Sequence, residues 1–284
     1  MAGRLRLAGL GAAAALLGCR VPPPDLSRDP AQLLAAVRGA QGRVARVQGS
    51  AKVRIDSPEL SGWIDEFAAA EKPDRVRLET RDFFGNVAAV LVADGGRFAL
   101  YDARRQVYYR GEATAENVSR LLPVALPPAD LAAVLCGSAP LIEGAPREVE
   151  VRGARLLLRL GGGSSEQELS VGEEAAVETS RVRRPAPAPG EGGRPDYDLE
   201  FDAFRRRGGA RFPTVARLSA PAAGVRLELR WKEDLEVNGP PDPALFRLDP
   251  PRGARVVELA PGAAVPPLEL PARPGPPAGS PPRE

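Results

Sequence analysis

The feature that most constrains this chain is a two-residue repeat of apolar side chains. Apolar and polar residues alternate over 47–55 and again over 63–69, and a third apolar segment covers 87–93. Successive side chains of a strand point to opposite faces of a sheet, so this period predicts half-buried strands. The residues Asp94-Gly95-Gly96 after the third segment are typical of a hairpin turn. We therefore expect an antiparallel meander.

Helical signals are confined to short segments. Asp29-Pro30 predicts the start of a first helix, Thr114 the start of a second, and Pro127-Pro128 the start of a third. Strand-like segments resume at 148–151 and recur as far as 225–231. The pattern predicts an α+β fold, a half-open antiparallel β-barrel of roughly 10–11 strands covered by a few short helices.

Composition excludes several classes of protein. The 284 residues include no histidine, which excludes Ser-His-Asp and Cys-His nucleophilic sites and the HExxH zinc site. The formal net charge is +2, so the chain lacks the overall positive field that draws a protein onto nucleic acid. We expect a protein that is not an enzyme and does not bind nucleic acid.

Residues 1–18 have the order of a secretory signal peptide. Arg4 and Arg6 precede an apolar stretch over 7–17, and the small residue Gly18 follows. This stretch is shorter than the roughly 20 residues that a transmembrane helix needs. We therefore expect the segment to be removed rather than retained as an anchor.

The sequence Leu16-Leu17-Gly18-Cys19 resembles the bacterial lipobox. The resemblance implies that Cys19 becomes the first residue and carries diacylglycerol on its thiol and an acyl chain such as palmitate on its amino group. Several acyl chains make such an anchor stable, and a flexible tether over 19–28 would follow. Arg20 stands where an aspartate retains lipoproteins in the inner membrane, so the resemblance implies the periplasmic face of the outer membrane. An ordinary signal peptide with a chance cysteine is the alternative.

The second cysteine, Cys136, closes an apolar helical segment. If Cys19 is lipidated, Cys136 has no partner for an intramolecular disulfide. Its apolar neighbours favour a buried core residue over a reactive thiol.

Two polar segments are weak candidates for ion binding. Asp196, Asp198, Glu200 and Asp202 share one face of a predicted strand. This pattern is compatible with calcium, but it is more typical of a solvated face balanced by the arginines at 205–207. The glycine-rich segment 161–165 lacks the lysine of a phosphate-binding loop and is better interpreted as a hairpin turn. We expect no metal and no cofactor.

Composition also predicts the domain boundaries. Residues 29–250 carry the strand and helix patterns and are expected to form one barrel domain. Within it, the proline- and glycine-rich segment 183–194 is expected to be a loop. Residues 251–284 are rich in proline and are expected to form a disordered tail.

Three segments, in order along the chain, resemble the LolA/LolB lipoprotein-sorting family, and within it the LolB-like lipoproteins. Segment 75–86 resembles the family's third strand and its apolar-glycine loop, and 121–140 resembles its helix pair. Segment 231–246, with Asn238, resembles its last strand and the ending that follows. The resemblance implies an open barrel whose apolar interior receives acyl chains of lipoproteins or another hydrophobic ligand. It also implies a LolA-like carrier as a partner.

An acyl-chain cavity needs apolar side chains on inward strand positions, because each buried methylene contributes about 0.8 kcal/mol. We expect eleven residues to line it: Val53, Trp63, Phe67, Val76, Leu78, Val90, Phe98, Tyr108, Leu157, Leu227 and Leu229. A core filled by its own side chains is the alternative.

The loop between the third and fourth strands carries Phe83 and Phe84. In the LolB-like proteins a hydrophobic residue protrudes from this loop and takes part in placing lipoproteins in the membrane. The resemblance assigns that position to Phe84, with phenylalanine in place of leucine. An aromatic turn that folds back onto the core is the alternative.

The leading hypothesis is a receptor or carrier for acyl chains, held at the outer membrane by N-terminal acylation. A non-enzymatic envelope lipoprotein with a filled barrel, which binds its partners through its outer surface or its proline-rich tail, is the second hypothesis. An envelope enzyme is the third, and it is disfavoured because the sequence offers no convergent polar site.

Overall fold

The computed structural model describes residues 22–184 and 196–260, together with Leu268 and Pro271. The predicted signal peptide, the predicted lipidation site at Cys19 and most of the predicted tail lie outside these residues, as do residues 185–194 of the predicted loop. None of the helices in the described part of the chain combines the length and the apolar character that a membrane span needs.

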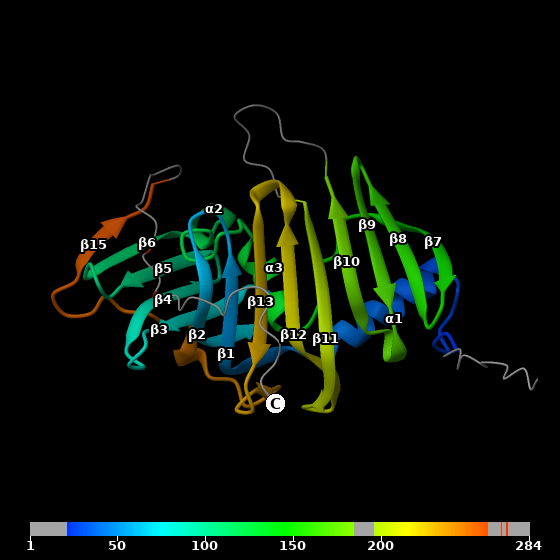
Figure 1. Ribbon diagram of the computed structural model, residues 1–284, viewed down its shortest axis with the longest axis horizontal. Helices are drawn as coiled ribbons and strands as arrows, with labels where there is room; N and C mark the ends of the chain where they lie inside the picture. The colour runs from blue at the N-terminus through cyan, green and yellow to red at the C-terminus, as the bar shows by residue number, and fades with distance from the viewer. Residues whose placement is uncertain (1–21, 185–195, 261–267, 269–270, 272–284) are drawn as a thin grey trace, which may run out of the picture.

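Within the described residues, fifteen strands join into one open sheet, with helices against one of its faces (Figure 1). The strands are β1 (Arg46–Asp56), β2 (Ser61–Glu71), β3 (Arg75–Arg81), β4 (Val87–Asp94), β5 (Arg97–Asp102), β6 (Val107–Glu112), β7 (Ala145–Arg152), β8 (Arg155–Gly162), β9 (Ser165–Val171), β10 (Val177–Arg183), β11 (Tyr197–Arg207), β12 (Ala210–Ala220), β13 (Val225–Trp231), β14 (Glu236–Val237) and β15 (Arg255–Glu258). The helices are α1 (Pro30–Gly42), α2 (Ala115–Val118) and α3 (Pro128–Leu135), with 3-10 turns at η1 (Glu173–Ala175), η2 (Pro221–Ala223) and η3 (Pro243–Phe246).

The order across the sheet is β15-β6-β5-β4-β3-β2-β1-β13-β12-β11-β10-β9-β8-β7, and β14 also pairs with β1. Every pair is antiparallel apart from β15 with β6, which is parallel. Because β15 and β7 lie at opposite ends of this order, the sheet does not close. The expected half-open antiparallel barrel with a few covering helices is confirmed.

Two expectations about the strands need correction. The sheet has more strands than the roughly 10–11 expected. β10 is among the strands that were not expected, because a β-bulge between Val177 and Thr179 shifts the side chains and hides the two-residue period. β15 lies beyond residue 250, where the barrel domain was expected to end, so part of the predicted tail belongs to the sheet.

The predicted starts of the helices hold. Asp29 caps α1, because its carboxylate accepts a hydrogen bond from the backbone N–H of Gln32 at 2.8 Å. Thr114 caps α2 in the same way, accepting from the backbone N–H of Asn117 at 3.2 Å. The glycine-rich segment 161–165 forms the turn between β8 and β9, as expected.

The two faces of the sheet differ in what covers them. α1 packs against β7 and β8, and α3 packs against β2 and β3, all on one face, which we call the helix-covered face. Directly paired residues of antiparallel strands point to the same face. Val53 pairs with Ile64, for example, and both point to the helix-covered face. We call the opposite face the open face.

The helix-covered face is buried in two apolar clusters. In one cluster Leu33 of α1, which is fully buried, packs among strand residues that include Tyr197 of β11. In the other, Leu135 of α3 packs with Leu91 of β4 and Leu100 of β5. Burying one such side chain contributes about 1.5–3 kcal/mol. These two helices therefore hold the two halves of the sheet in shape.

Asn238, which belongs to the third family-like segment, directly follows β14 and connects it to the residues that precede β1. Its side-chain amide donates to the backbone carbonyl of Arg43 at 2.7 Å and accepts from the backbone N–H of Ala45 at 2.9 Å. The residue has a φ of 56°, a left-handed conformation that asparagine tolerates better than most residues. This geometry explains why an asparagine stands at this position.

Candidate functional site

The turn between β3 and β4 is a rigid projection at one end of the sheet. The Asp82 carboxylate accepts from the backbone N–H of Phe84 at 2.9 Å and from that of Asn86 at 2.8 Å. Its other oxygen accepts from the Asn86 side chain at 3.1 Å. The Asn86 hydrogen bond lowers the pKa of the Asp82 carboxyl, so the carboxylate that holds the turn stays ionised. Gly85 has a φ of 84°, which glycine adopts without strain.

The two phenylalanines on this turn point into solvent. Phe83 is 68% exposed and Phe84 is 82% exposed. Their rings meet edge to face, with centroids 5.3 Å apart, a favourable aromatic geometry. Val87, the first residue of β4, is also exposed. The alternative in which these aromatics fold back onto the core is therefore wrong, and the turn presents an apolar tip to its surroundings.

The strand registers divide the eleven candidate lining residues between the two faces. Six of them point to the helix-covered face, as expected: Val53, Val76, Leu78, Phe98, Leu227 and Leu229. The other five point to the open face: Trp63, Phe67, Val90, Tyr108 and Leu157.

The physical reason for this correction is that several strands are apolar on both faces. Val90 is buried on the open face because Phe246 of η3 packs there. Tyr108 points the same way, and its hydroxyl donates to the backbone carbonyl of Leu248 at 2.6 Å. A segment that returns over the open face thus buries residues that a two-layer fold would expose, and apolar character alone does not identify the inward side.

The helix-covered face is closely packed around the ends of α1 and α3. A cavity of about 30 Å³ lies there, lined by residues that include Gln41, Cys136 and Phe212. Such a volume accommodates a water molecule or two and no acyl chain. Access for a longer ligand would require a covering helix to move.

Glu66 is a buried acid on the helix-covered face that was not among the predicted site residues. It lies between Ala51 and Thr80 on the neighbouring strands and is 5% exposed. Thr80 donates its hydroxyl to one carboxyl oxygen at 2.9 Å, and the other oxygen has no hydrogen-bond partner. Burial raises the pKa of Glu66 to about 8. The two-residue period places Glu66 on the strand face opposite to Trp63 and Phe67. Because these two aromatics were expected to point inward, Glu66 was expected to point outward.

Cys136 lies in the core, as expected, and is 1% exposed. Burial raises the pKa of its thiol to about 12, so the nucleophilic thiolate is scarce at neutral pH. Nearby, the Lys72 ammonium donates to the Gln41 carbonyl at 2.8 Å and to the Ser138 hydroxyl at 2.7 Å. This lysine joins the end of α1 to the end of α3, which is a structural role.

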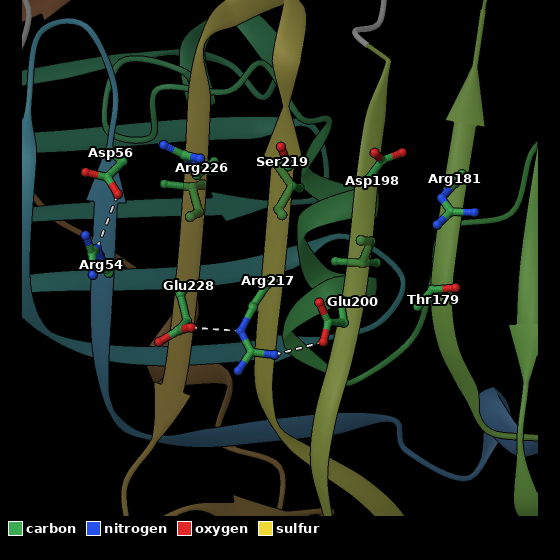
Figure 2. A pocket seen from close by; sticks show the side chains of 13 residues that line it. Arg54, Asp56, Thr179, Arg181, Asp198, Glu200, Arg217, Ser219, Arg226 and Glu228 are labelled. Carbon is green, nitrogen blue, oxygen red and sulfur yellow. Dashed lines mark hydrogen bonds and ion pairs between the residues drawn. The ribbon is translucent and has the colours of Figure 1, made fainter. Parts of the chain in front are cut away.

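The open face carries a hollow of about 410 Å³ over β1 and β10–β13 (Figure 2). Arg217 lies in the hollow, with its Nε 2.8 Å from a Glu228 oxygen and its Nη1 3.0 Å from a Glu200 oxygen. The Glu228 hydrogen bond raises the pKa of the Arg217 guanidinium. The hollow is therefore lined by charges that neutralise one another.

Three of the four carboxylates considered for calcium, Asp198, Glu200 and Asp202, lie on β11 and pair with arginines. Asp196 precedes β11 and accepts from the backbone N–H of Arg184 at 2.6 Å. Arg217 also reaches Asp202 at 3.3 Å, and Arg183 pairs with Asp198 at 2.8 Å. These partners come from neighbouring strands and not from the arginines at 205–207 that were expected to balance the carboxylates. Within the described part of the chain no group of acidic or cysteine side chains is arranged to hold a metal ion. The geometry favours a solvated ion-pair surface.

Comparisons with solved structures identify the fold to which this chain is similar. No protein-family model matches the sequence, and no curated protein sequence is similar to it. Among solved structures, a LolA superfamily protein from Nitrosomonas europaea is 12% identical and aligns over 76% of this chain and 97% of its own length, with a TM-score of 0.52. A putative outer membrane lipoprotein-sorting protein domain from Vibrio parahaemolyticus is 11% identical over 75% of this chain and 95% of its own, also with a TM-score of 0.52.

A DUF1329 family protein from Desulfovibrio piger is similar to the same extent, at 12% identity over 78% of this chain and 98% of its own, with a TM-score of 0.53. At such low identity these similarities are similarities of fold. They confirm the LolA-type open barrel that the sequence resemblance implied.

Proposed function

We propose that this LolA-type chain is a receptor or carrier for acyl chains, anchored by an acylated Cys19 to the periplasmic face of the outer membrane. The observation that carries the proposal is the Phe83–Phe84 turn, which is held rigid by Asp82 and exposed to solvent. Fold alone does not specify function, so the proposal depends on this site.

An exposed aromatic pair is costly in water and favourable in a lipid phase. Each phenylalanine can bury at least roughly 150 Å² of surface. At about 25 cal/mol per Å², transfer of both rings into the acyl region of a bilayer supplies several kcal/mol. A turn whose backbone is already ordered loses little further entropy when it inserts. The turn is therefore suited to contact the membrane during transfer of a hydrophobic cargo.

The helix-covered face supplies the apolar surface that an acyl chain needs. Val76, Leu78 and Phe98 lie there, and in the present structure they pack in the same cluster as Leu131 and Leu135 of α3. A bound acyl chain would contact these strand residues in place of α3. Loading would thus displace α3, and a LolA-like carrier is the partner that would deliver the chain. The lipoprotein-sorting description of the Vibrio structure supports this class of cargo.

The test combines lipid analysis with a transfer assay. The chain is purified from the envelope, and bound lipid is identified by native mass spectrometry and extraction. Transfer of an acylated lipoprotein to vesicles is then measured for the wild type and for Phe84→Glu. We expect co-purifying acyl lipid, and we expect the variant to retain bound lipid but to lose transfer.

Val151→Glu is the matched control. Val151 is 40% exposed on the edge strand β7, at the other end of the sheet. The control adds the same charge at an exposed apolar residue, so it should leave transfer unchanged. A wild-type protein with neither bound lipid nor transfer activity would refute the receptor proposal.

The close packing around α1 and α3 favours a second candidate, an envelope scaffold with a filled barrel. Its interior would stay closed, and its surface would bind other envelope components. Hydrogen exchange separates the two candidates: an acyl ligand should alter exchange of the α3 amides if α3 is displaced, and it should leave them unchanged in a scaffold.

A further inference from the structure

Three loops lie at the same end of the sheet. They are the apolar β3–β4 turn, the β5–β6 turn and the segment that leads into β15. Asp102, at the end of β5, pairs with Ala89 of β4, and the backbone N–H of Ala103 donates to the Ala88 carbonyl at 3.0 Å. The β5–β6 turn therefore lies two strand spacings, about 10 Å, from the β3–β4 turn. β15 begins beside it, because the backbone N–H of Arg255 donates to the Gln106 carbonyl at 2.9 Å.

Arginines are concentrated on these three loops. Five exposed arginines lie at this end: Arg81, Arg104, Arg105, Arg252 and Arg255. The chain as a whole has a formal charge of only +2, so this is a local enrichment. The two aspartates of the turns, Asp82 and Asp102, are both occupied with backbone hydrogen bonds.

Asp102 orders the backbone of the β5–β6 turn, as Asp82 orders the backbone of the aromatic turn. One Asp102 oxygen accepts from the backbone N–H groups of Arg104 and Arg105, each at 3.0 Å. The other oxygen lies 3.3 Å from the Arg105 guanidinium. Arg81 pairs with Glu79 at 3.3 Å and remains exposed. The end of the sheet is thus a fixed apolar tip with cationic side chains on neighbouring loops.

We propose that this end docks onto an anionic phospholipid surface, with Phe83 and Phe84 inserted and the flanking arginines on lipid phosphates. The inference rests on the proposed function and deepens it by naming the lipid. Guanidinium groups bind phosphate in a bidentate manner, and a basic residue near an anionic membrane contributes about fivefold in affinity. The aromatic tip can insert into any bilayer, whereas the arginines make binding to negatively charged bilayers tighter.

The docking end lies far from the start of α1, the helix that follows the predicted tether. α1 begins beside β7, whereas the aromatic turn is at the opposite end of the longest axis (Figure 1). From Cys19 to Pro30 the chain reaches at most about 40 Å. An anchored molecule that docks as proposed would therefore lie with its long axis along the membrane, attached at both ends.

The test uses the chain from residue 19 to 284 with Cys19→Ser, which keeps every described residue and removes acylation. Binding is measured to vesicles of phosphatidylcholine alone and to vesicles that also contain phosphatidylglycerol. We expect tighter binding to the anionic vesicles, weakened by salt. Arg104→Gln/Arg252→Gln should lose about 30-fold in affinity for the anionic vesicles and bind neutral vesicles as the wild type does. Phe84→Glu should bind both weakly.

Arg205→Gln/Lys52→Gln is the control, because it removes the same charge from exposed residues outside the three loops, on β11 and β1. Equal wild-type binding to both vesicles, no binding to either, or an unchanged arginine variant would overturn the proposal. An arginine variant that binds vesicles normally but fails to receive acyl cargo from an acidic carrier protein would also overturn the proposal. That result would assign the arginines to a protein partner. Anionic binding without any acyl-chain transfer would instead refute the proposed function and leave this inference standing.

Discussion

The Thr80 hydroxyl donates a hydrogen bond to the Glu66 carboxyl at 2.9 Å across adjacent strands of the helix-covered face. Both side chains are buried, and the second Glu66 oxygen has no partner. An ionised carboxylate would be strongly disfavoured there. The pair therefore holds a neutral carboxylic acid inside a face otherwise built for apolar contact.

This arrangement makes stability depend on pH in a specific direction. Burial raises the pKa of Glu66 from 4.5 to about 8, so between these values the folded state binds a proton that the unfolded state releases. The free energy of unfolding should fall as pH rises through this window, by up to about 1.4 kcal/mol per pH unit. Urea unfolding at about pH 5 and about pH 8.5 measures the slope.

Glu66→Gln removes the titrating group and keeps its size, so it should flatten the slope. Glu150→Gln on the exposed edge strand β7 is the surface control. Parallel pH profiles for the wild type and Glu66→Gln would contradict the assignment of the slope to this residue.

Asp82 should determine how rigid the aromatic turn is. Asp82→Ala removes the acceptor of the Phe84 and Asn86 amides, so these amides should exchange faster with solvent while the rest of the sheet is unchanged. Asp242→Ala, which removes the acceptor that caps η3, tests whether the effect is local. Exchange at Phe84 that does not change in Asp82→Ala would show that the turn is ordered by other contacts.

Leu33 should be essential for the attachment of α1. It is fully buried among the second cluster's side chains, and Leu33→Ala should cost about 2–5 kcal/mol because a cavity is left behind. Denaturant unfolding monitored by circular dichroism measures the loss. Val151→Ala, at an exposed position, should change stability by no more than about 0.5 kcal/mol. A similar cost for both variants would argue against the α1 packing.

Cys136 should react with thiol reagents only when the protein unfolds. Its burial and raised pKa of about 12 leave little accessible thiolate. In Cys19→Ser, where Cys136 is the remaining cysteine, the labelling rate at neutral pH should follow the unfolded population as urea is added. Rapid labelling of the folded protein would place the thiol at an accessible surface.

Much of the local structure followed from the sequence alone. The caps at Asp29 and Thr114 and the β3–β4 turn were predictable because hydrogen bonds between near neighbours determine them. The two-residue period likewise identified β1 and β2 as strands, since alternation is a local property. The LolA-type fold was accessible from the order of three short segments along the chain.

The tertiary structure decided which side of each strand faces the helices. Trp63 and Phe67 were assigned to the interior, where Glu66 lies instead. In β4 both faces are apolar because the η3 segment returns across the open face, and a local pattern does not reveal what a distant segment covers. β15 joins the sheet through parallel pairing with β6, about 150 residues earlier in the chain. That pairing brings Arg252 and Arg255 beside the β5–β6 turn, so the arginine-flanked aromatic end exists only in the folded chain.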